Sequence, residues 1–316
     1  MAVSTTGMAR DNVSVLMPNE IAKEIIKEVS QTSACLSLMK RLPNMSKGVY
    51  QMPVLEALAT AYFVGETSGF PNRKKPTSEV WANKYIYAEE IAAIVPIPQA
   101  FLDDADYDIF AEIKPQIEEA LGNVIDSAIL YGTGAPATWP TNILDAANAA
   151  GNNVILGTGA DIYDDILDEG GLVSKLEAEG YFVNGFIGAL SLRSKLRGLR
   201  DADGNLIFNV IQEQAKYALD GQDILFPLNG AIDVSKSYLI AGDWTKAVYS
   251  IRQDITYKVL TEGVIQADDG SILYNLAQQD MVALRCVMRL GWQVPNPVNR
   301  IQPTEANRYP FGVLTP

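Results

Sequence analysis

The spacing of hydrophobic positions changes several times along the chain and divides it into segments of different predicted structure. Residues 1–17 are small and polar with scattered apolar positions, which is typical of an arm rather than a core segment. From Pro18 to about Lys40, apolar residues recur every three or four positions, so the pattern predicts a helix that Pro43 stops. Proline fits the first turn of this helix, because its missing N–H needs no partner there.

Residues 48–90 have the pattern of two strands joined by a long turn. Val49–Leu55 and residues 80–88 alternate in the manner of strands, and the polar, Gly- and Pro-rich stretch Gly65–Pro76 separates them. An extended hairpin is therefore expected. It has too few apolar positions on one face to bury itself, and an isolated two-stranded ribbon is marginal in water, so we expect it to pack on another surface.

A strand over Ile91–Pro98 precedes the longest predicted helix, at about residues 105–131. The apolar residues of this helix form one stripe, which we expect to pack on a sheet built from the C-terminal strands. Pro115 lies inside the stripe and is expected to kink or divide the helix, and Gly132 is expected to end it. The stripe consists of Ile109, Ile113, Ile117, Leu121, Val124, Ile125 and Ala128.

The second half of the chain begins with the mixed pattern of an α/β unit, over about residues 151–242. Helices are expected over Tyr163–Glu179 and Ser191–Arg200, and short strands over Phe182–Ile187 and Tyr238–Ile240. The remainder has strand composition, including a run from Met281 to Val294. After Pro295 the chain is rich in Pro and Asn, and an extended tail is expected.

Composition places the chain among folded globular proteins. Its 316 residues suffice for about two domains, and 48% of them are hydrophobic against 20% charged. Lys and Arg total 25 and Asp and Glu total 38, so the net charge is −13 and the isoelectric point is near 4.5. A surface this acidic repels phosphate backbones, which argues against a dedicated nucleic-acid grip.

The complete lack of histidine narrows the chemistry further. It excludes Ser-His-Asp and Cys-His catalysis and imidazole metal sites, and leaves carboxylate, lysine and oxygen-liganded metal chemistry open. Cys35 and Cys286 have apolar neighbours, so two buried, reduced thiols are expected. Neither a signal peptide nor a stretch long and apolar enough to span a membrane is visible, and we expect a cytosolic product.

Acidic clusters are the remaining candidates for chemistry. Asp103–Asp106 could supply paired carboxylates, but a helix start, where negative charge is stabilised, explains it more simply. The run Asp161–Glu169 is expected to be a solvated helix face. Asp201–Asn205 has the odd spacing of a calcium loop, but Gly204 stands at the fourth position and Glu213 misses the twelfth, so an Asp-Gly turn is expected. The sequence therefore supports no catalytic, cofactor-binding or metal-binding residue.

The order of these elements resembles that of a known family. The resemblance rests on a strand with an acidic turn, the end of the long helix, a turn in the α/β unit and the return into the last strands. These stretches are residues 95–105, 126–132, 199–205, 240–244, 249–252 and 282–290. Together they resemble the major capsid proteins of tailed bacteriophages, which have the Hong Kong 97-type capsid fold that encapsulins share.

The resemblance implies an α+β fold with four parts. An N-terminal arm and first helix would cover residues 1–35, and the extended two-stranded loop residues 48–90. The peripheral domain would take residues 36–47, 91–148 and 246–316, with its spine helix at about 105–131, and the axial α/β domain residues 149–245. In the family the long loop reaches over adjacent subunits, which fits a hairpin that cannot bury itself.

The same resemblance implies a structural protein, not an enzyme, that needs no cofactor. Subunits would assemble into hexamers and pentamers of an icosahedral phage head that encloses double-stranded DNA without sequence-specific binding. Because Met1 almost abuts the arm, a separate scaffolding protein or none is expected, with a portal and, as a candidate, a decoration protein. The virion would be its location, after assembly in the host cytoplasm. An encapsulin-type shell and a soluble α+β enzyme that uses carboxylates are the alternatives.

Candidate contact residues lie at the tip of the hairpin. They are Glu66, Phe70, Arg73, Lys74 and Lys75. The three cations would meet a neighbour's acidic surface at Asp103–Asp106 or Asp161–Glu169, and a solvated tip is the alternative. Some family members crosslink a loop lysine to a C-terminal asparagine near a glutamate. The candidates for that reaction here are Lys74, Lys75, Asn299, Asn307 and Glu305.

Overall fold

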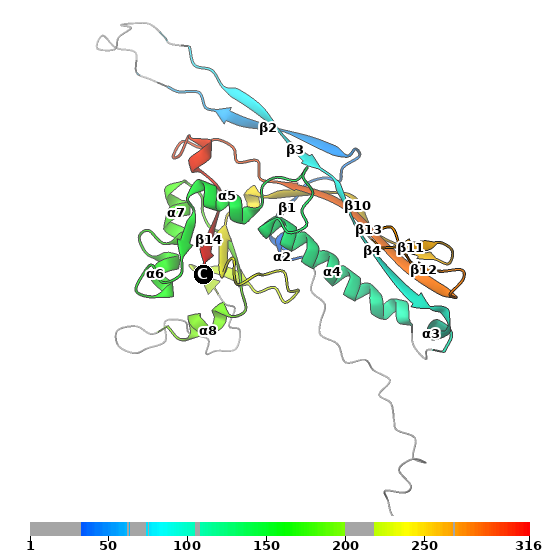
Figure 1. The fold of residues 1–316 in the computed structure, drawn as a ribbon. Coiled ribbons are helices and arrows are strands. Elements are labelled where there is room, and N and C mark those ends of the chain that lie inside the picture. Colours follow the sequence, from blue (N-terminus) through cyan, green and yellow to red (C-terminus); the bar gives the residue numbers. More distant parts are fainter. Residues whose placement is uncertain are drawn as a thin grey trace, which may run out of the picture.

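The subunit is elongated, with one β-sheet toward each end and a long helix that runs along one of them (Figure 1). The computed structural model describes residues 33–61, 63, 74, 76–104, 108–199, 218–267 and 269–316. Helices and strands are both present, as the predicted α+β class requires. The arm over residues 1–32, most of the hairpin tip and the Asp201–Asn205 turn lie outside the described residues.

A four-stranded sheet forms one end, and its strand order is β1-β10-β13-β4. The strands are β1 (Lys40–Arg41), β10 (Val248–Leu260), β13 (Met281–Gln293) and β4 (Glu89–Pro98). The long strand β13 pairs antiparallel with both β10 and β4. The spacing predicts a helix that continues to about Lys40. In the structure the short helix α2 (Ala34–Leu38) ends earlier, and Lys40 begins strand β1.

The long helix α4 runs unbroken from Ile109 to Tyr131. Asp108 caps it by accepting hydrogen bonds from two first-turn N–H groups, at 3.0 and 3.2 Å. Gly132 ends it with a positive φ of 70°, a conformation that glycine adopts without strain. Pro115 does not divide the helix, so that part of the prediction is wrong. Proline removes a single backbone hydrogen bond there, and packing on the sheet holds the adjoining turns.

The first half of α4 packs on the four-stranded sheet through its apolar stripe, as predicted. Leu121, only 3% exposed, lies in one apolar cluster with Leu284 and Cys286 of β13. Val124 is 47% exposed and does not join this contact, which corrects the predicted stripe. The reason is the helical period, because a step of three residues places Val124 about 60° around the helix from Leu121.

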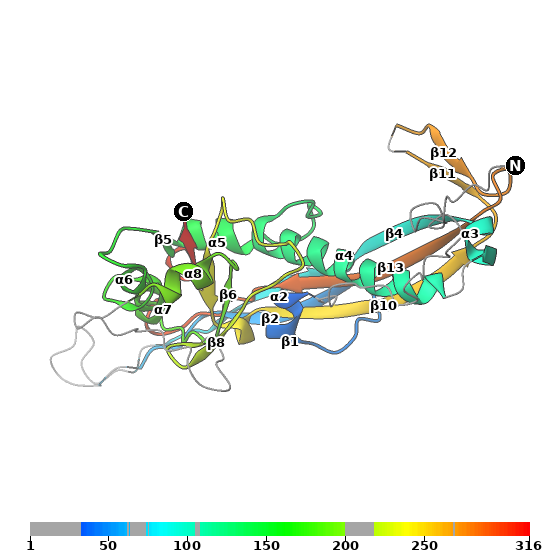
Figure 2. The same ribbon diagram turned by 90° about the horizontal axis from the view of Figure 1, so that it is seen from below.

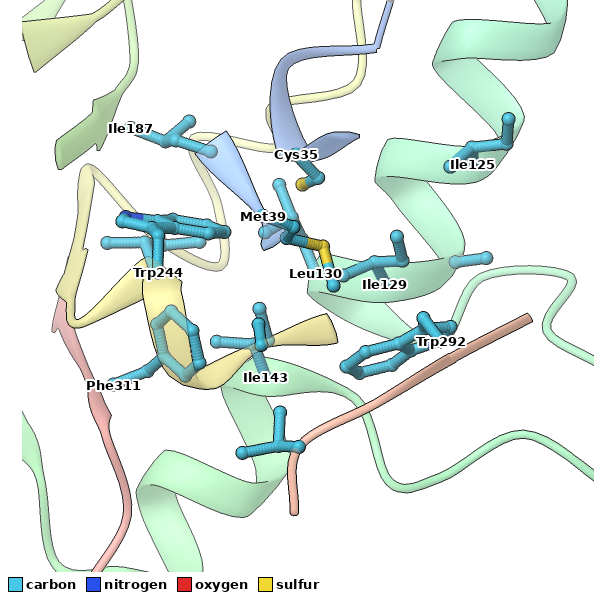
Figure 3. Close-up of a cluster of buried hydrophobic side chains, with 14 of the residues drawn as sticks. Cys35, Met39, Ile125, Ile129, Leu130, Ile143, Ile187, Trp244, Trp292 and Phe311 are labelled. Atoms are coloured by element: carbon cyan, nitrogen blue, oxygen red, sulfur yellow. The ribbon is translucent and has the colours of Figure 1, made fainter. Parts of the chain in front are cut away.

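A central apolar core connects the two ends of the subunit (Figure 3). The end of α4 and helices α2 and α5 (Ile143–Ala150) contribute to it, together with residues of both sheets. Its buried members include Cys35, Met39, Ile125, Ile129, Leu130, Ile143, Ile187, Trp244, Trp292 and Phe311. The rings of Trp244 and Phe311 meet edge to face, with centroids 4.8 Å apart. Both cysteines are buried and unpaired, as predicted, and burial raises the pKa of Cys35.

The other end of the subunit holds a six-stranded sheet of order β5-β14-β9-β6-β8-β7. Its strands are β5 (Asn153–Ile155), β14 (Phe311–Thr315), β9 (Leu239–Gly242), β6 (Gly185–Gly188), β8 (Gln222–Leu225) and β7 (Ala218–Leu219). Strand β14 pairs with both β5 and β9. The end of the chain is therefore not only an extended tail, and the range 246–316 does not form one unit with the four-stranded sheet.

Three short helices accompany the six-stranded sheet and share an apolar cluster with it. They are α6 (Ile162–Leu167), α7 (Leu172–Ala178) and α8 (Leu192–Arg197). The single helix predicted over Tyr163–Glu179 is thus two helices, because Gly170 takes a positive φ of 86° between them. A single glycine is a weaker signal in the sequence than a continuous helical spacing of apolar residues. The sequence therefore predicted one helix where the structure has two.

Two hairpins extend beyond the two larger sheets, and the short one stands clear of the body in Figure 2. The long one pairs β2 (Val49–Ala57) with β3 (Val80–Tyr87) and confirms the predicted two-stranded loop. The short one pairs β11 (Val264–Gln266) with β12 (Ile272–Asn275) at the far end of the four-stranded sheet. The remaining elements are the helix α3 (Gln99–Asp104) and the 3-10 turns η1 (Trp244–Lys246) and η2 (Glu305–Asn307).

Truncating Leu121 to alanine should lower the free energy of unfolding by about 2–5 kcal/mol, because it removes a buried side chain and leaves a cavity. Val124→Ala on the same helix is the matched control and should cost less than about 1 kcal/mol, since that side chain is half exposed. Urea titration of the unassembled subunit measures both. Equal losses would contradict the assignment of the buried face.

Candidate functional site

The long hairpin has two unlike faces because side chains alternate along each strand. The register pairs Val49 with Tyr87 and Leu55 with Trp81. On one face, Ile86 is fully buried. At Gly291 of β13 an added Cβ would lie 2.2 Å from the carbonyl oxygen of Tyr87, so the two backbones are in close approach there. This face is therefore the one that rests on the body of the subunit.

The opposite face of the hairpin is exposed and rich in aromatic side chains, with the polar Gln51 and Asn83 among them. Trp81 is 62% exposed, and Val49, Tyr85 and Tyr87 on the same face are also exposed. The rings of Tyr85 and Tyr87 lie 6.3 Å apart, which lengthens the aromatic surface along the strand. Clustered aromatic side chains of this kind mark interaction surfaces, because a single subunit gains nothing by leaving them in water.

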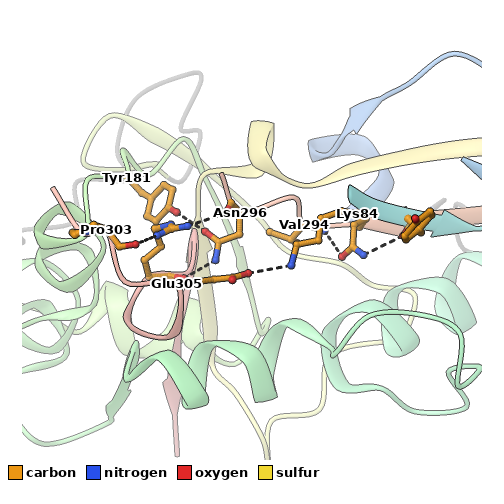
Figure 4. Close-up of polar contacts among 9 residues, drawn as sticks. Lys84, Tyr181, Val294, Asn296, Pro303 and Glu305 are labelled. Atoms are coloured by element: carbon orange, nitrogen blue, oxygen red, sulfur yellow. Dashed lines mark hydrogen bonds and ion pairs between the residues drawn. The ribbon is translucent and has the colours of Figure 1, made fainter. Parts of the chain in front are cut away.

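Polar contacts tie the hairpin to the segment that follows β13 (Figure 4). We call residues 293–308 the strap. Lys84 Nζ forms an ion pair with Glu305 Oε1 at 3.0 Å, and Gln293 Nε2 donates to the carbonyl of Tyr85 at 3.1 Å. Farther out, the N–H of Val298 donates to the carbonyl of Leu55 at 3.0 Å. These contacts hold the hairpin along its length, and Ile86 adds an apolar contact with Met45 and Val248 of the body.

Arg308 holds the strap in its looped shape. This side chain is 3% exposed, and its guanidinium donates to the carbonyls of Asn296, Gln302 and Pro303 at 2.9–3.1 Å. The hydroxyl of Tyr181 donates to the side-chain oxygen of Asn296 at 2.8 Å. Burial raises the pKa of Tyr181 to about 12, so this donor stays protonated at neutral pH.

Asp126 is a second buried polar centre and lies on α4. Its carboxylate is fully buried and accepts hydrogen bonds from the hydroxyl of Ser33, from the N–H groups of Ala34 and Cys35, and from the amide of Asn229, at 2.5–3.0 Å. It thereby fixes the start of α2, the point where the N-terminal arm joins the body, and the loop around residue 229. Four donors satisfy a charge that would otherwise be costly to bury.

The predicted contact residues at the hairpin tip fall mostly outside the described residues. Glu66, Phe70, Arg73 and Lys75 all do so, and Lys74 is described and exposed. The structure therefore does not test the predicted contact of the tip cations, which stays a prediction.

Three of the predicted crosslink residues, Asn299, Glu305 and Asn307, lie on the strap, and Lys74 and Lys75 belong to the hairpin tip. Glu305 pairs with Lys84 and not with Lys74 in the same subunit. Asn299 uses both ends of its amide, donating to the carbonyl of Glu179 at 2.7 Å and accepting from the N–H of Gln302 at 2.7 Å. Asn307 is exposed on η2.

The acidic clusters have structural explanations that differ in part from those predicted. Asp103 and Asp104 end α3 rather than begin a helix, and the cap of α4 is Asp108. Within the Asp161–Glu169 run, Asp165 is buried and accepts hydrogen bonds from the N–H groups of Gly157 and Gly159, so this face is not wholly solvated. No group of three potential metal ligands occurs in the described part of the chain.

Sequence reasoning missed the three residues that organise this region: Lys84, Asp126 and Arg308. A charged residue on the buried stripe of a helix was an available signal for Asp126, because charges are rarely buried without partners. Arg308 directly precedes the buried run Tyr309–Leu314, which is a similar but weaker signal. Lys84 carried none, since its partner lies more than 200 residues away in the sequence.

Comparison with known proteins identifies the fold and the family. The phage capsid family matches residues 13–303 of this chain. The chain belongs to the phage capsid family. A major capsid protein of Staphylococcus phage 80alpha is 29% identical over 280 residues, which cover 87% of this chain and 81% of that protein. The family and the relative's name favour a phage capsid over the encapsulin alternative.

Solved structures agree with this membership of the phage capsid family. A chain from Microbacterium phage Oxtober96 superposes with a TM-score of 0.84 at 34% identity, covering 98% of this chain and 99% of that one. The capsid of a native GTA particle shares the fold, with a TM-score of 0.69 at 15% identity over 99% of each chain. The protein is a structural, non-enzymatic capsid subunit that assembles into a shell and forms part of the virion.

The family match and the similar solved structures confirm the expectation of a capsid subunit with the Hong Kong 97-type fold.

No helix in the described residues is long and apolar enough to cross a membrane.

Replacing Asp126 with alanine should lower the free energy of unfolding by more than about 3 kcal/mol, because several buried donors lose their acceptor at once. Asp126→Asn keeps one acceptor oxygen, so its free energy of unfolding should lie between those of the wild type and Asp126→Ala. The control Asp168→Ala changes an exposed carboxylate and should stay within about 0.5 kcal/mol. Denaturant titration that found Asp126→Ala as mild as the control would contradict this role.

Reversing the charge of Lys84 should weaken the hold of the strap on the hairpin. Lys84→Glu places two carboxylates together, and Glu305→Lys places two ammonium groups together, so either change should speed hydrogen exchange at the Val298 N–H, which bonds the hairpin. The double variant restores opposite charges and should slow that exchange again. The effect is small, about 0–1 kcal/mol, because the pair is partly exposed. Exchange in the double variant as fast as in either single one would argue against the pair.

Proposed function

We propose that this subunit builds hexamers and pentamers of an icosahedral phage head, and that the exposed face of its long hairpin packs on an adjacent copy. The observation that carries the proposal is the aromatic face of Trp81, Tyr85 and Tyr87, which has no covering element in the described part of the chain. A ribbon of two strands is marginal alone, so its apolar face needs a partner to be stable. In a shell made of this protein, the available partner is a second copy.

The energetic reasoning follows from repetition. Each buried Å² of apolar surface contributes about 25 cal/mol, so a few partly exposed aromatic rings supply only a few kcal/mol per contact after ordering costs. A closed shell repeats the contact at every subunit, and many modest contacts add to a stable particle. Weak individual contacts also let misplaced subunits leave during assembly.

The division of the chain supports the proposed arrangement in the capsomer. The six-stranded sheet with α6, α7 and α8 corresponds to the axial domain, which in the family meets its copies around the centre of the hexamer or pentamer. The four-stranded sheet with α4 corresponds to the peripheral domain. Strand β14 adds Phe311–Thr315 to the axial unit, beyond the proposed range of residues 149–245.

Net charge supports a shell that encloses double-stranded DNA without gripping it. With 38 acidic against 25 basic residues the protein repels phosphate, so the packaged DNA can fill and leave the head. The cations Arg73, Lys74 and Lys75 are proposed to pair with an acidic surface on a neighbour, and Asp161 and Glu169 are exposed there. Such pairs weaken as salt rises.

The remaining partners are proposed from the family resemblance. They are a separate scaffolding protein, a portal and a decoration protein, with assembly in the host cytoplasm. Covalent crosslinking through Lys74 or Lys75 with Asn299 or Asn307, near Glu305, is the least supported of these roles, because Asn299 and Glu305 already have partners within the subunit.

Replacing Trp81 and Tyr85 together with serine should leave a folded subunit that assembles poorly, because both side chains are exposed and contribute to the neighbour contact rather than to the core. Sedimentation and electron microscopy of purified protein should show capsomers and particles for the wild type and a shift to free subunits for the variant. The matched control is Val80→Ser, an exposed apolar position on the opposite side of the same strand, which should assemble normally.

Normal particles from the double serine variant would contradict the proposed hairpin contact. A wild-type protein that forms only a small closed oligomer would contradict the proposed shell itself.

A further inference from the structure

One face of the four-stranded sheet is open at the end farthest from the central core. Helix α4 packs on the other face, where it meets Leu284 and Cys286 of β13. Because side chains alternate along a strand, Arg285 between them points to the open face. The base of the long hairpin covers this face at Gly291, about 20 Å farther along β13. The described residues therefore leave the sheet around Arg285 accessible.

Two cations lie side by side on the open face. Lys258 of β10 is paired directly with Arg285 of β13, and both side chains are exposed. Within the described residues neither side chain forms an ion pair or a hydrogen bond. Like charges directly opposite each other destabilise an antiparallel pair of strands. The isolated subunit gains nothing from this arrangement, whereas an anion that lies over both side chains would stabilise it.

Another cation on the same face already has an acidic partner. Arg289, farther along β13, is paired with Glu90 of β4, and its Nε donates to a carboxylate oxygen of Glu90 at 2.7 Å. Among the paired residues of β4, β10 and β13, Glu90 is the one carboxylate on this face. Lys258 and Arg285 are thus a local excess of positive charge on a chain whose net charge is −13.

An apolar side chain lies next to the two cations. Ile94 of β4 is paired with Arg285 on its other side and is 45% exposed, and Ala92 on the same face is also exposed. The solvated face of an antiparallel sheet is ordinarily polar. Two cations beside an isoleucine fit a ligand that carries carboxylates next to apolar side chains. A phosphate backbone fits less well, because it offers no apolar group to cover Ile94.

Charge disfavours two ways in which another copy of this chain could cover the face. Two copies of the face in direct contact would bring four cations together. The tip of the long hairpin is also basic, through Arg73, Lys74 and Lys75, so the hairpin of another copy is repelled from Lys258 and Arg285. An acidic segment of a different protein meets neither penalty.

We propose that Lys258, Arg285 and Ile94 form a docking surface for an acidic, amphipathic segment of a second protein. Carboxylates of this segment lie over the two cations, and its apolar side chains lie on Ile94 and Ala92. A helix suits the surface, because packing of a helix on a sheet is a common way to cover a sheet face. The inference rests on the shell proposed above, since every subunit of a shell offers the surface and many modest contacts add.

A model ligand tests the surface directly. A fluorescein-labelled peptide of Glu and Leu, with the Leu on one helical face, should bind the full-length protein. The same peptide with Gln in place of Glu should bind about tenfold more weakly, because it has lost its charge. Fluorescence anisotropy measures both peptides, on unassembled subunits and on purified particles. Added salt should weaken the binding of the Glu peptide.

Charge reversal locates the binding surface on the subunit. Lys258→Glu combined with Arg285→Glu should weaken binding of the Glu peptide about tenfold. The matched control combines Lys195→Glu with Arg197→Glu, two exposed positions of α8 beside the six-stranded sheet. It makes the same change in net charge and should bind the peptide as the wild type does.

The single variant Lys258→Glu controls for a folding defect. It replaces the like-charge pair with opposite charges, so the urea midpoint of the unassembled subunit should equal or exceed that of the wild type. Binding of the Glu peptide should nevertheless fall. A urea midpoint below that of the wild type would show that the two cations do not repel each other, and would overturn the inference.

The remaining outcomes separate the docking surface from the shell. Absence of peptide binding to both subunits and particles, or equal binding by the charge-reversed double variant, would overturn the docking surface. Tighter binding of a double-stranded DNA oligonucleotide through the same two cations would assign the surface to nucleic acid instead. Wild-type protein that forms only a small closed oligomer would overturn the shell, and the peptide measurement on subunits would still decide the docking surface.

Photocrosslinking tests whether another copy covers the surface. Benzoylphenylalanine at position 94 should give no crosslink between subunits in purified particles, as examined by mass spectrometry. A crosslink to any segment of another copy would assign the face to a contact between subunits and overturn the second-protein partner.

Discussion

The subunit depends on one helix being shared by two apolar cores. The first half of α4 packs on the four-stranded sheet through Leu121, and its second half enters the central core through residues such as Ile129 and Leu130. Because the interior is close-packed on both sides, neither sheet can shift along the helix without opening a cavity. The long axis of the subunit is thereby fixed, and Asp126, on the same helix, adds the position of α2 and of the loop around Asn229.

The hairpin is attached to the body largely through polar contacts, whereas the body is held together by apolar packing. Ion-pair and hydrogen-bond contacts such as Lys84–Glu305 hold it to the strap, and its apolar face points away from the subunit. Polar contacts of this kind tolerate small changes in angle, whereas packed apolar side chains do not. The outer part of the hairpin, which polar contacts hold, can therefore adjust more easily than the part at Ile86, which is packed against Met45 and Val248.

Much of this architecture could be predicted from local pattern alone. The hairpin, the strand at residues 91–98, the long helix and its glycine end all follow from periodicity and turn chemistry, and the structure confirms them. Errors arose where a distant partner decided the outcome. Strand β14 was not recognised because its neighbours β5 and β9 lie far from it in the sequence. The error at Val124 was local, because positions 124 and 125 lie on either side of the stripe's axis and only Ile125 is buried. The candidate site was the part least predictable from the sequence, because only the fold brings Lys84 and Glu305 together.

The position of β14 inside the six-stranded sheet has a consequence for how the protein is made. A ribosome releases the chain from its N-terminus, so β5, β6, β8 and β9 are all synthesised before the strand that lies between β5 and β9. Until Phe311–Thr315 emerges, β5 has no strand beside it and one edge of β9 stays open. A nascent or shortened chain therefore cannot complete the sheet, and only translation products that extend through these residues become subunits able to join a shell.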